Sequence, residues 1–144
     1  MNAPAHPWLK HYPPGVRWDA PIEQTILQTL LDRAVEAYGE RPLYEYRGRR
    51  ISFREMGDLT AKAAAGFVEI GIKKGDTVAL YLPNTPYHPI AFFGALRAGA
   101  QITHLSPLDA ERDLIYKLQD SGARTLVTTN LFRLLPTALK LLAD

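Results

Sequence analysis

The chain contains no cysteine among its 144 residues. This absence excludes disulfides, thiolate metal sites and a cysteine nucleophile, and it is typical of a protein from a reducing compartment. An excess of one charge is also missing, because 17 basic and 15 acidic residues leave a net charge of only +2. A balance this even does not favour binding to nucleic acid or to an anionic membrane surface. We therefore expect a cytoplasmic protein without a nucleic-acid partner.

Long apolar runs and glycine-rich loops are absent as well. No run approaches the ~18 apolar residues of a membrane span, and the N-terminus lacks the basic and apolar regions of a signal peptide. We expect at most peripheral membrane contact. The sequence has no GxGxxG, GxxxxGK or GxSxG motif, and Pro83-Asn84-Thr85 stands where a phosphate loop would follow the first parallel strand. The residues alone therefore indicate no active site.

What is present is an alternation of short apolar runs and helical patterns. The expected strands are 77–82, 101–105 and 124–128, and the expected helices between them are 86–98 and 109–121. Gly99 and Gly122 follow the two helices, where a left-handed residue ends a helix. Parallel strands need such crossovers, so we predict an α/β fold with a parallel βαβαβ unit and 77–82 as its central strand.

Three elements are expected before this unit. Apolar residues recur at helical spacing over 22–38. Residues 43–46 and 50–53 predict a β-hairpin around Arg47-Gly48-Arg49, and Ser52 with Glu55 predicts a capping box that starts a second helix. Arg47, Arg49 and Arg50 could bind phosphate or nucleic acid, but a solvated turn is the favoured interpretation.

The two ends of the chain and one helix add further expectations. Residues 1–21 hold five prolines together with Trp8, Tyr12 and Trp18, which predicts an extended arm lying on the domain, 22–144, or on a partner chain. A proline-rich ligand for another protein is the alternative. Residues 90–98 form a helix that is apolar almost all round and needs to be covered. Residues 130–143 are helix-like but interrupted by Pro136.

Two groups of residues could bind a metal. Asp109, Glu111 and Asp113 would not share one helix face, so we interpret them as first-turn carboxylates that favour the helix dipole. The four histidines, which have no metal-ligand spacing, are His6, His11, His88 and His104. The last two lie near the carboxyl ends of expected strands, where open α/β sheets bind ligands. A structural role is the favoured interpretation, and we assign no metal, catalytic or cofactor-binding residue.

Several motifs, taken in order, resemble one family. They are Lys74–Asn84, Phe93–Gly99, Pro107-Leu108 and Leu118–Ala123, together with Trp8-Leu9, Tyr12-Pro13 and Gly15-Val16 near the start. The sequence resembles the N-terminal part of adenylate-forming acyl-CoA synthetases, and its opening resembles bacterial long-chain fatty-acid CoA ligases. The resemblance implies activation of a carboxylic acid by ATP with Mg²⁺, followed by acyl transfer to coenzyme A.

The same resemblance limits what this chain can do. The family's phosphate loop, its adenine and ribose contacts and its catalytic lysine come later than these motifs, so no catalytic residue can be carried over. Ser106-Pro107 replaces the frequent Asn-Pro, and Asp109-Ala110 replaces a hydroxyl cap. Dicarboxylic or aromatic acids therefore stay open beside fatty acids.

Two hypotheses follow from these observations. The first is an N-terminal fragment of an acyl-CoA ligase that is inactive alone, binds no cofactor by itself and has the remainder of the ligase as its partner. The second is a non-catalytic α/β binding or scaffolding module. A homodimer stays open under either hypothesis.

Overall fold

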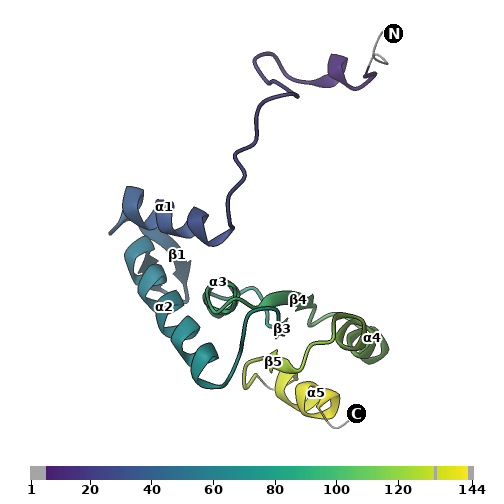
Figure 1. Ribbon diagram of the computed structural model, residues 1–144. Helices are drawn as coiled ribbons and strands as arrows, with labels where there is room; N and C mark the ends of the chain where they lie inside the picture. The colour runs from purple at the N-terminus through teal and green to yellow at the C-terminus, as the bar shows by residue number, and fades with distance from the viewer. Residues whose placement is uncertain (1–5, 132, 143–144) are drawn as a thin grey trace.

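The computed structural model describes residues 6–131 and 133–142, and it centres on a small parallel sheet (Figure 1). The helices are η1 (Leu9–His11), α1 (Gln28–Tyr38), α2 (Phe53–Glu69), α3 (Tyr87–Arg97), α4 (Glu111–Ser121) and α5 (Leu134–Leu141). The strands are β1 (Pro42–Tyr46), β2 (Arg49–Ser52), β3 (Thr77–Tyr81), β4 (Gln101–Leu105) and β5 (Thr125–Val127). Among the described residues, no helix combines the length and the apolar character that crossing a bilayer requires.

The parallel sheet has the strand order β4-β3-β5. Leu80 of β3 pairs with His104 of β4 on one side and with Val127 of β5 on the other. β3 is almost completely buried, as expected for a strand covered on both faces and flanked on both sides. The predicted α/β fold with a parallel βαβαβ unit is confirmed, and so is the central position of its first strand.

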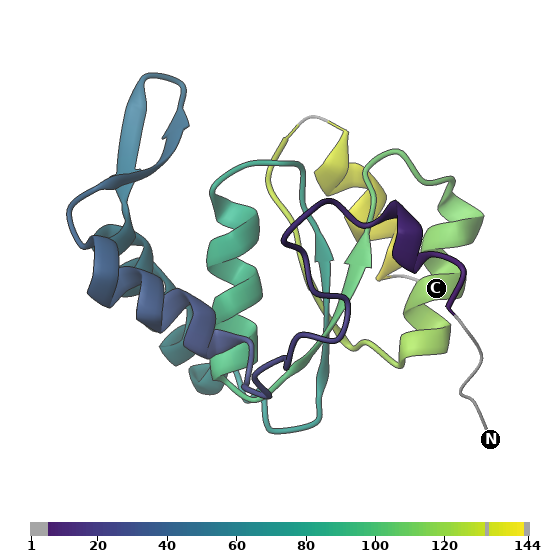
Figure 2. The same ribbon diagram turned by 90° about the horizontal axis from the view of Figure 1, so that it is seen from above.

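Helices cover both faces of the sheet because alternate side chains of β3 point in opposite directions. Val78 and Leu80 pack with residues of α2 and α3 in one cluster. Ala79 and Tyr81 pack in a second cluster, which includes Leu114 of α4 and three residues of α5. Figure 2 shows α3 on one face and α4 with α5 on the other, with the hairpin projecting beyond them. The domain therefore has three layers.

The two helices α2 and α3 lie close together at a pair of small residues. A Cβ atom added at Gly94 would lie 2.7 Å from the Cβ of Ala63 and 3.3 Å from the α2 backbone. Gly94 is buried in α3, so the glycine is what permits this approach. A third cluster, formed by Leu31, Ile51 and Met56, joins α1 and the hairpin to α2.

Turns and helix ends follow the predicted chemistry with one change. Gly122 ends α4 in the left-handed conformation, as predicted. The hairpin turn consists of Arg47 and Gly48 alone, both with positive φ (52° and 76°), which is a type I′ arrangement. Arg49 therefore belongs to β2 rather than to the turn. The Ser52 side chain accepts a hydrogen bond from the Glu55 amide at 3.1 Å, which is the Ser52 half of the predicted capping box, whereas the Glu55 carboxylate pairs with Arg49.

Three helices begin later than the sequence pattern suggested. α1 begins at Gln28 instead of residue 22, because Ile22 and Ile26 find nothing to pack against and are 90% and 68% exposed. α4 begins at Glu111, so Asp109 precedes the helix. α5 begins at Leu134, which places Pro136 in its first turn, where the missing amide hydrogen is tolerated. Ala143 lies outside the described residues.

The arm and α3 were both expected to need cover. The described part of the arm, 6–21, extends away from the domain (Figure 1), and its Trp8 and Trp18 are 50% and 48% exposed, with both rings near His6. The domain of the same chain does not cover them, so a partner chain stays a prediction. In α3, by contrast, every residue from 90 to 98 except Arg97 is buried or half-buried. The exposed apolar side chains therefore lie on other elements.

Candidate functional site

The carboxyl ends of β3, β4 and β5 meet at one edge of the sheet. The chain leaves this edge through Leu82–Thr85 after β3, through Ser106 after β4 and through Thr128–Asn130 after β5. In open α/β sheets this edge is where ligands bind, so the side chains that the fold brings there are the candidates for a site.

Two histidines from different elements meet at this edge. His88 lies in the first turn of α3, and His104 is the second-last residue of β4. The Nε2 atom of His88 and the Nδ1 atom of His104 are 3.2 Å apart, and the two rings are nearly parallel. Phe92, one helical turn after His88, stacks against the His104 ring. The sequence placed both histidines near strand ends, and only the crossover geometry brings them into contact.

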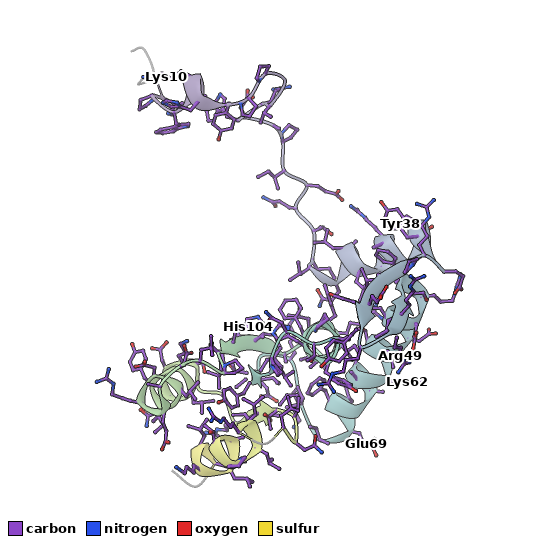
Figure 3. All side chains as sticks on the ribbon, turned by 180° about the vertical axis from the view of Figure 1, so that it is seen from behind. Lys10, Tyr38, Arg49, Lys62, Glu69 and His104 are labelled. Atoms are coloured by element: carbon purple, nitrogen blue, oxygen red, sulfur yellow. The ribbon has the colours of Figure 1, made fainter. Side chains whose placement is uncertain are left out.

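The two rings differ in their surroundings. His88 is half-buried, whereas His104 is exposed, and Figure 3 labels it at the outer surface of the domain. Burial lowers the pKa of His88, and the neighbouring His104 lowers it further, because a second positive charge beside the first is unfavourable. The His88 ring is therefore disposed to be neutral. His6 and His11 lie on the arm, away from this site.

An apolar groove lies near the end of β5. It has a volume of about 580 Å³ and lies between α2, α3 and the residues that follow β5. Its apolar wall includes Phe67, Ile70 and Ile90, and its polar side includes Thr128 and Asn130. The Thr128 hydroxyl is buried without a hydrogen-bond partner. The groove suits an apolar segment or ligand more than a highly charged one.

The loop after β3 differs from a phosphate-binding loop. After β3 two backbone amides are already used within the loop, because Thr85 donates to Pro83 O at 2.8 Å and His88 donates to Thr85 O at 3.0 Å. Phosphate cradles need several free amides that point at the anion, usually from glycine-rich backbone. The loop after β3 therefore does not fit the phosphates of ATP.

The acidic residues near α4 do not converge. Asp109 accepts hydrogen bonds from Lys117 Nζ at 2.6 Å and from the Ser106 amide at 3.2 Å, and the first of these lowers the pKa of the Asp109 carboxyl. Glu111 pairs instead with Lys140 at 3.7 Å. Asp113 pairs with its neighbour Arg112 at 3.6 Å. Within residues 6–131 and 133–142, no three histidine or acidic side chains are grouped to hold a metal ion.

The hairpin arginines are also paired locally. Arg49 pairs with Glu55, and Arg50 pairs with Glu45 at 3.2 Å. Arg47 lies over the Tyr46 ring at 5.6 Å. These contacts agree with the favoured interpretation of a solvated hairpin tip.

Comparison with known proteins identifies the family. The three-layer α/β unit is an open, parallel α/β sheet with helices on both faces. The family model described as AMP-binding enzyme matches residues 31–143. The chain belongs to this family. The long-chain fatty-acid CoA ligase of Haemophilus influenzae is 37% identical over 128 residues, which cover 87% of this chain and 23% of that protein. The corresponding ligase of Bacillus subtilis is 31% identical over 135 residues, which cover 94% of this chain and 24% of that protein.

Solved structures agree on the fold. The inhibitor-bound N-terminal domain of FACL13 from Mycobacterium tuberculosis has a TM-score of 0.74 at 24% identity, over 81% of this chain and 29% of that one. The resemblance to adenylate-forming enzymes seen in the sequence is confirmed. The chain spans about a quarter of the length of the curated relatives it matches.

Proposed function

We propose that this chain is the N-terminal part of an ATP-dependent acyl-CoA ligase of the cytoplasm. The observation that carries the proposal is the family match over residues 31–143, because it includes both the sheet and the helices on its two faces. The reaction would convert a carboxylic acid, ATP and coenzyme A into acyl-CoA, AMP and diphosphate, with Mg²⁺ accompanying the ATP.

The substrate we propose is a long-chain fatty acid. The relatives that are 31% and 37% identical carry that activity in their names. Ser106-Pro107 and Asp109 lie just after β4 and differ from the residues that such ligases often have there. Dicarboxylic and aromatic acids therefore belong in the same substrate panel.

We further propose that residues 1–144 neither bind ATP tightly nor make acyl-CoA alone. Two amides of the loop after β3 are occupied within the loop, and the sequence has no glycine-rich phosphate loop, which supports this proposal. Loss of a single preorganised donor at a developing oxyanion costs about 2.7–4 kcal/mol, which corresponds to roughly a 100- to 1,000-fold loss of rate. A chain without the whole set should therefore show no exchange above background.

The test is a carboxylate-dependent ATP–pyrophosphate exchange assay. Purified residues 1–144 are compared with the same chain extended to the end of its reading frame, and each is assayed with fatty, dicarboxylic and aromatic acids. The extended chain should exchange pyrophosphate most rapidly with a long-chain fatty acid. The short chain should match a control from which the acid is omitted.

Either protein can overturn its part of the proposal. Exchange by the short chain would mean that a nucleotide site lies within residues 1–144. Absence of pyrophosphate exchange by the extended chain with every acid would contradict the ligase proposal. A reading frame that ends at Asp144 would instead favour the second candidate, a non-catalytic binding or scaffolding module, because the buried clusters around β3 give this unit a core of its own.

A further inference from the structure

The histidine pair at the edge of the sheet has a geometry that its neighbours help to fix. His88 is held by the first turn of α3, and His104 is held in the ladder of β4 opposite Leu80. Phe92 lies against the His104 ring, with the ring centroids 5.5 Å apart. Two imidazoles from separate elements thus face each other through one nitrogen each, 3.2 Å apart.

This nitrogen separation fits a shared metal ion as well as a hydrogen bond. Two imidazoles on a tetrahedral Zn²⁺, with Zn–N bonds of about 2.0–2.1 Å, have their nitrogens about 3.3 Å apart. A right-angled arrangement with bonds of the same length would bring the nitrogens to about 2.9 Å. The observed 3.2 Å lies nearer to the tetrahedral value. At this separation one ion can lie within bonding distance of both nitrogens.

We propose that His88 and His104 form a two-imidazole binding site for Zn²⁺. The Nε2 atom of His88 and the Nδ1 atom of His104 are the ligand atoms. Both must be unprotonated when the metal is bound, so each ring then carries its proton on its far nitrogen, Nδ1 of His88 and Nε2 of His104. The site is independent of the ligase proposal and is distinct from any Mg²⁺ that accompanies ATP, because Mg²⁺ prefers oxygen ligands.

The surroundings agree with this site. The exposure of His104 leaves a path for the ion. His88 also lines a cavity of about 330 Å³ whose wall includes Glu45 and Asn84. Glu45 is paired with Arg50, so water is the ligand we assign to the remaining positions. A bound ion would fasten the start of α3 to the end of β4.

The test is a titration with ZnCl₂ of a chain that keeps only this pair. Untagged residues 1–144 with His6→Ala and His11→Ala retain His88 and His104 as their only histidines. Calorimetry should show one Zn²⁺ per chain, and MgCl₂ should give no binding. NMR of the imidazole nitrogens should show both rings shifting together with a single stoichiometric step.

Single substitutions test whether both rings are needed. His104→Gln and His88→Gln should each weaken Zn²⁺ binding at least about tenfold. The loss of a residue that only supports a metal ligand already weakens metal binding by about 10- to 100-fold. His104 is exposed, so its variant should keep the circular dichroism spectrum of the parent. Absence of Zn²⁺ binding by the parent would overturn the proposal. Unchanged Zn²⁺ binding by the His104→Gln variant would also overturn the proposal. The same two titrations in the extended chain are judged by the same outcomes.

Discussion

The packing of α2 against α3 predicts that one added methyl group at Gly94 will destabilise the domain. In Gly94→Ala the new Cβ would lie 2.7 Å from the Ala63 Cβ, well inside ordinary contact, and 3.3 Å from the backbone at Ala63 and Ala64. Backbone atoms cannot rotate away as a side chain can, so the helices must separate. Overpacking of this kind costs about 1–3 kcal/mol.

Helix propensity acts in the opposite direction and must be separated from the steric cost. Alanine is favoured over glycine in a helix interior by about 0.8–1.0 kcal/mol. Gly66, in α2, supplies the matched control, because a Cβ added there meets no atom within 4 Å. Gly66→Ala should therefore stabilise the chain by roughly the propensity gain alone. The difference between the two variants isolates the steric cost.

The assay is urea unfolding followed by circular dichroism at 222 nm. Gly94→Ala should unfold at lower urea than Gly66→Ala, by a free-energy difference of about 1–3 kcal/mol. Ala63→Gly alone should cost about the propensity difference of 0.8–1.0 kcal/mol, and it should cost less than this when added to Gly94→Ala, since it then also removes the nearest atom but leaves the backbone contacts. Equal stabilities of Gly94→Ala and Gly66→Ala would refute the reasoning and show that α2 and α3 are not in close contact at this point.

Two further predictions concern the surface and acid stability. The arm and α5 carry exposed apolar side chains, including Trp8, Trp18 and Leu139. Residues 1–144 should therefore self-associate and bind a hydrophobic dye. A monodisperse monomer by light scattering that binds no dye would contradict this prediction. The Lys117 hydrogen bond holds the pKa of Asp109 below its unfolded value, so its contribution to stability is present above about pH 4 and is lost as pH falls through the folded pKa. Asp109→Asn should therefore flatten the loss of stability at acid pH, measured by urea unfolding at several pH values. Asp113→Asn, in an exposed ion pair with N and O atoms 3.6 Å apart, should change this pH dependence less. Equal pH dependence for the two variants would contradict the assignment to Asp109.

The sequence predicted the elements whose signals are local. Each strand of the parallel unit is a short apolar run, and Gly122 marks the end of α4 because a left-handed residue is needed there. Ser52 was identified as a cap because its hydroxyl lies three residues before an amide that it can reach. In such cases the residues that decide the structure are neighbours in the chain.

The predictions from sequence were incomplete or wrong where contacts between distant parts of the chain, or the lack of such contacts, determine the structure. Ile22 and Ile26 fit a helical spacing, yet they meet no surface in the described structure, and periodicity alone could not show this. α3 was expected to need cover, and only the structure shows that Ala63 and Gly94 allow α2 to come close enough to supply it. The contact between His88 and His104 depends on strand register across a crossover, and only their shared position near strand ends pointed to it.

The strand order also determines where the sheet could grow. β3 lies in the middle, so within the described residues the outer edges of β4 and β5 each present backbone N–H and C=O groups to no further strand. β4 has five residues, Gln101–Leu105, whereas β5 has three, Thr125–Val127. A strand arriving beside β4 would gain more ladder hydrogen bonds than one arriving beside β5. The β4 edge is therefore the stronger template for any added strand, and that strand would run past His104, next to the paired imidazoles.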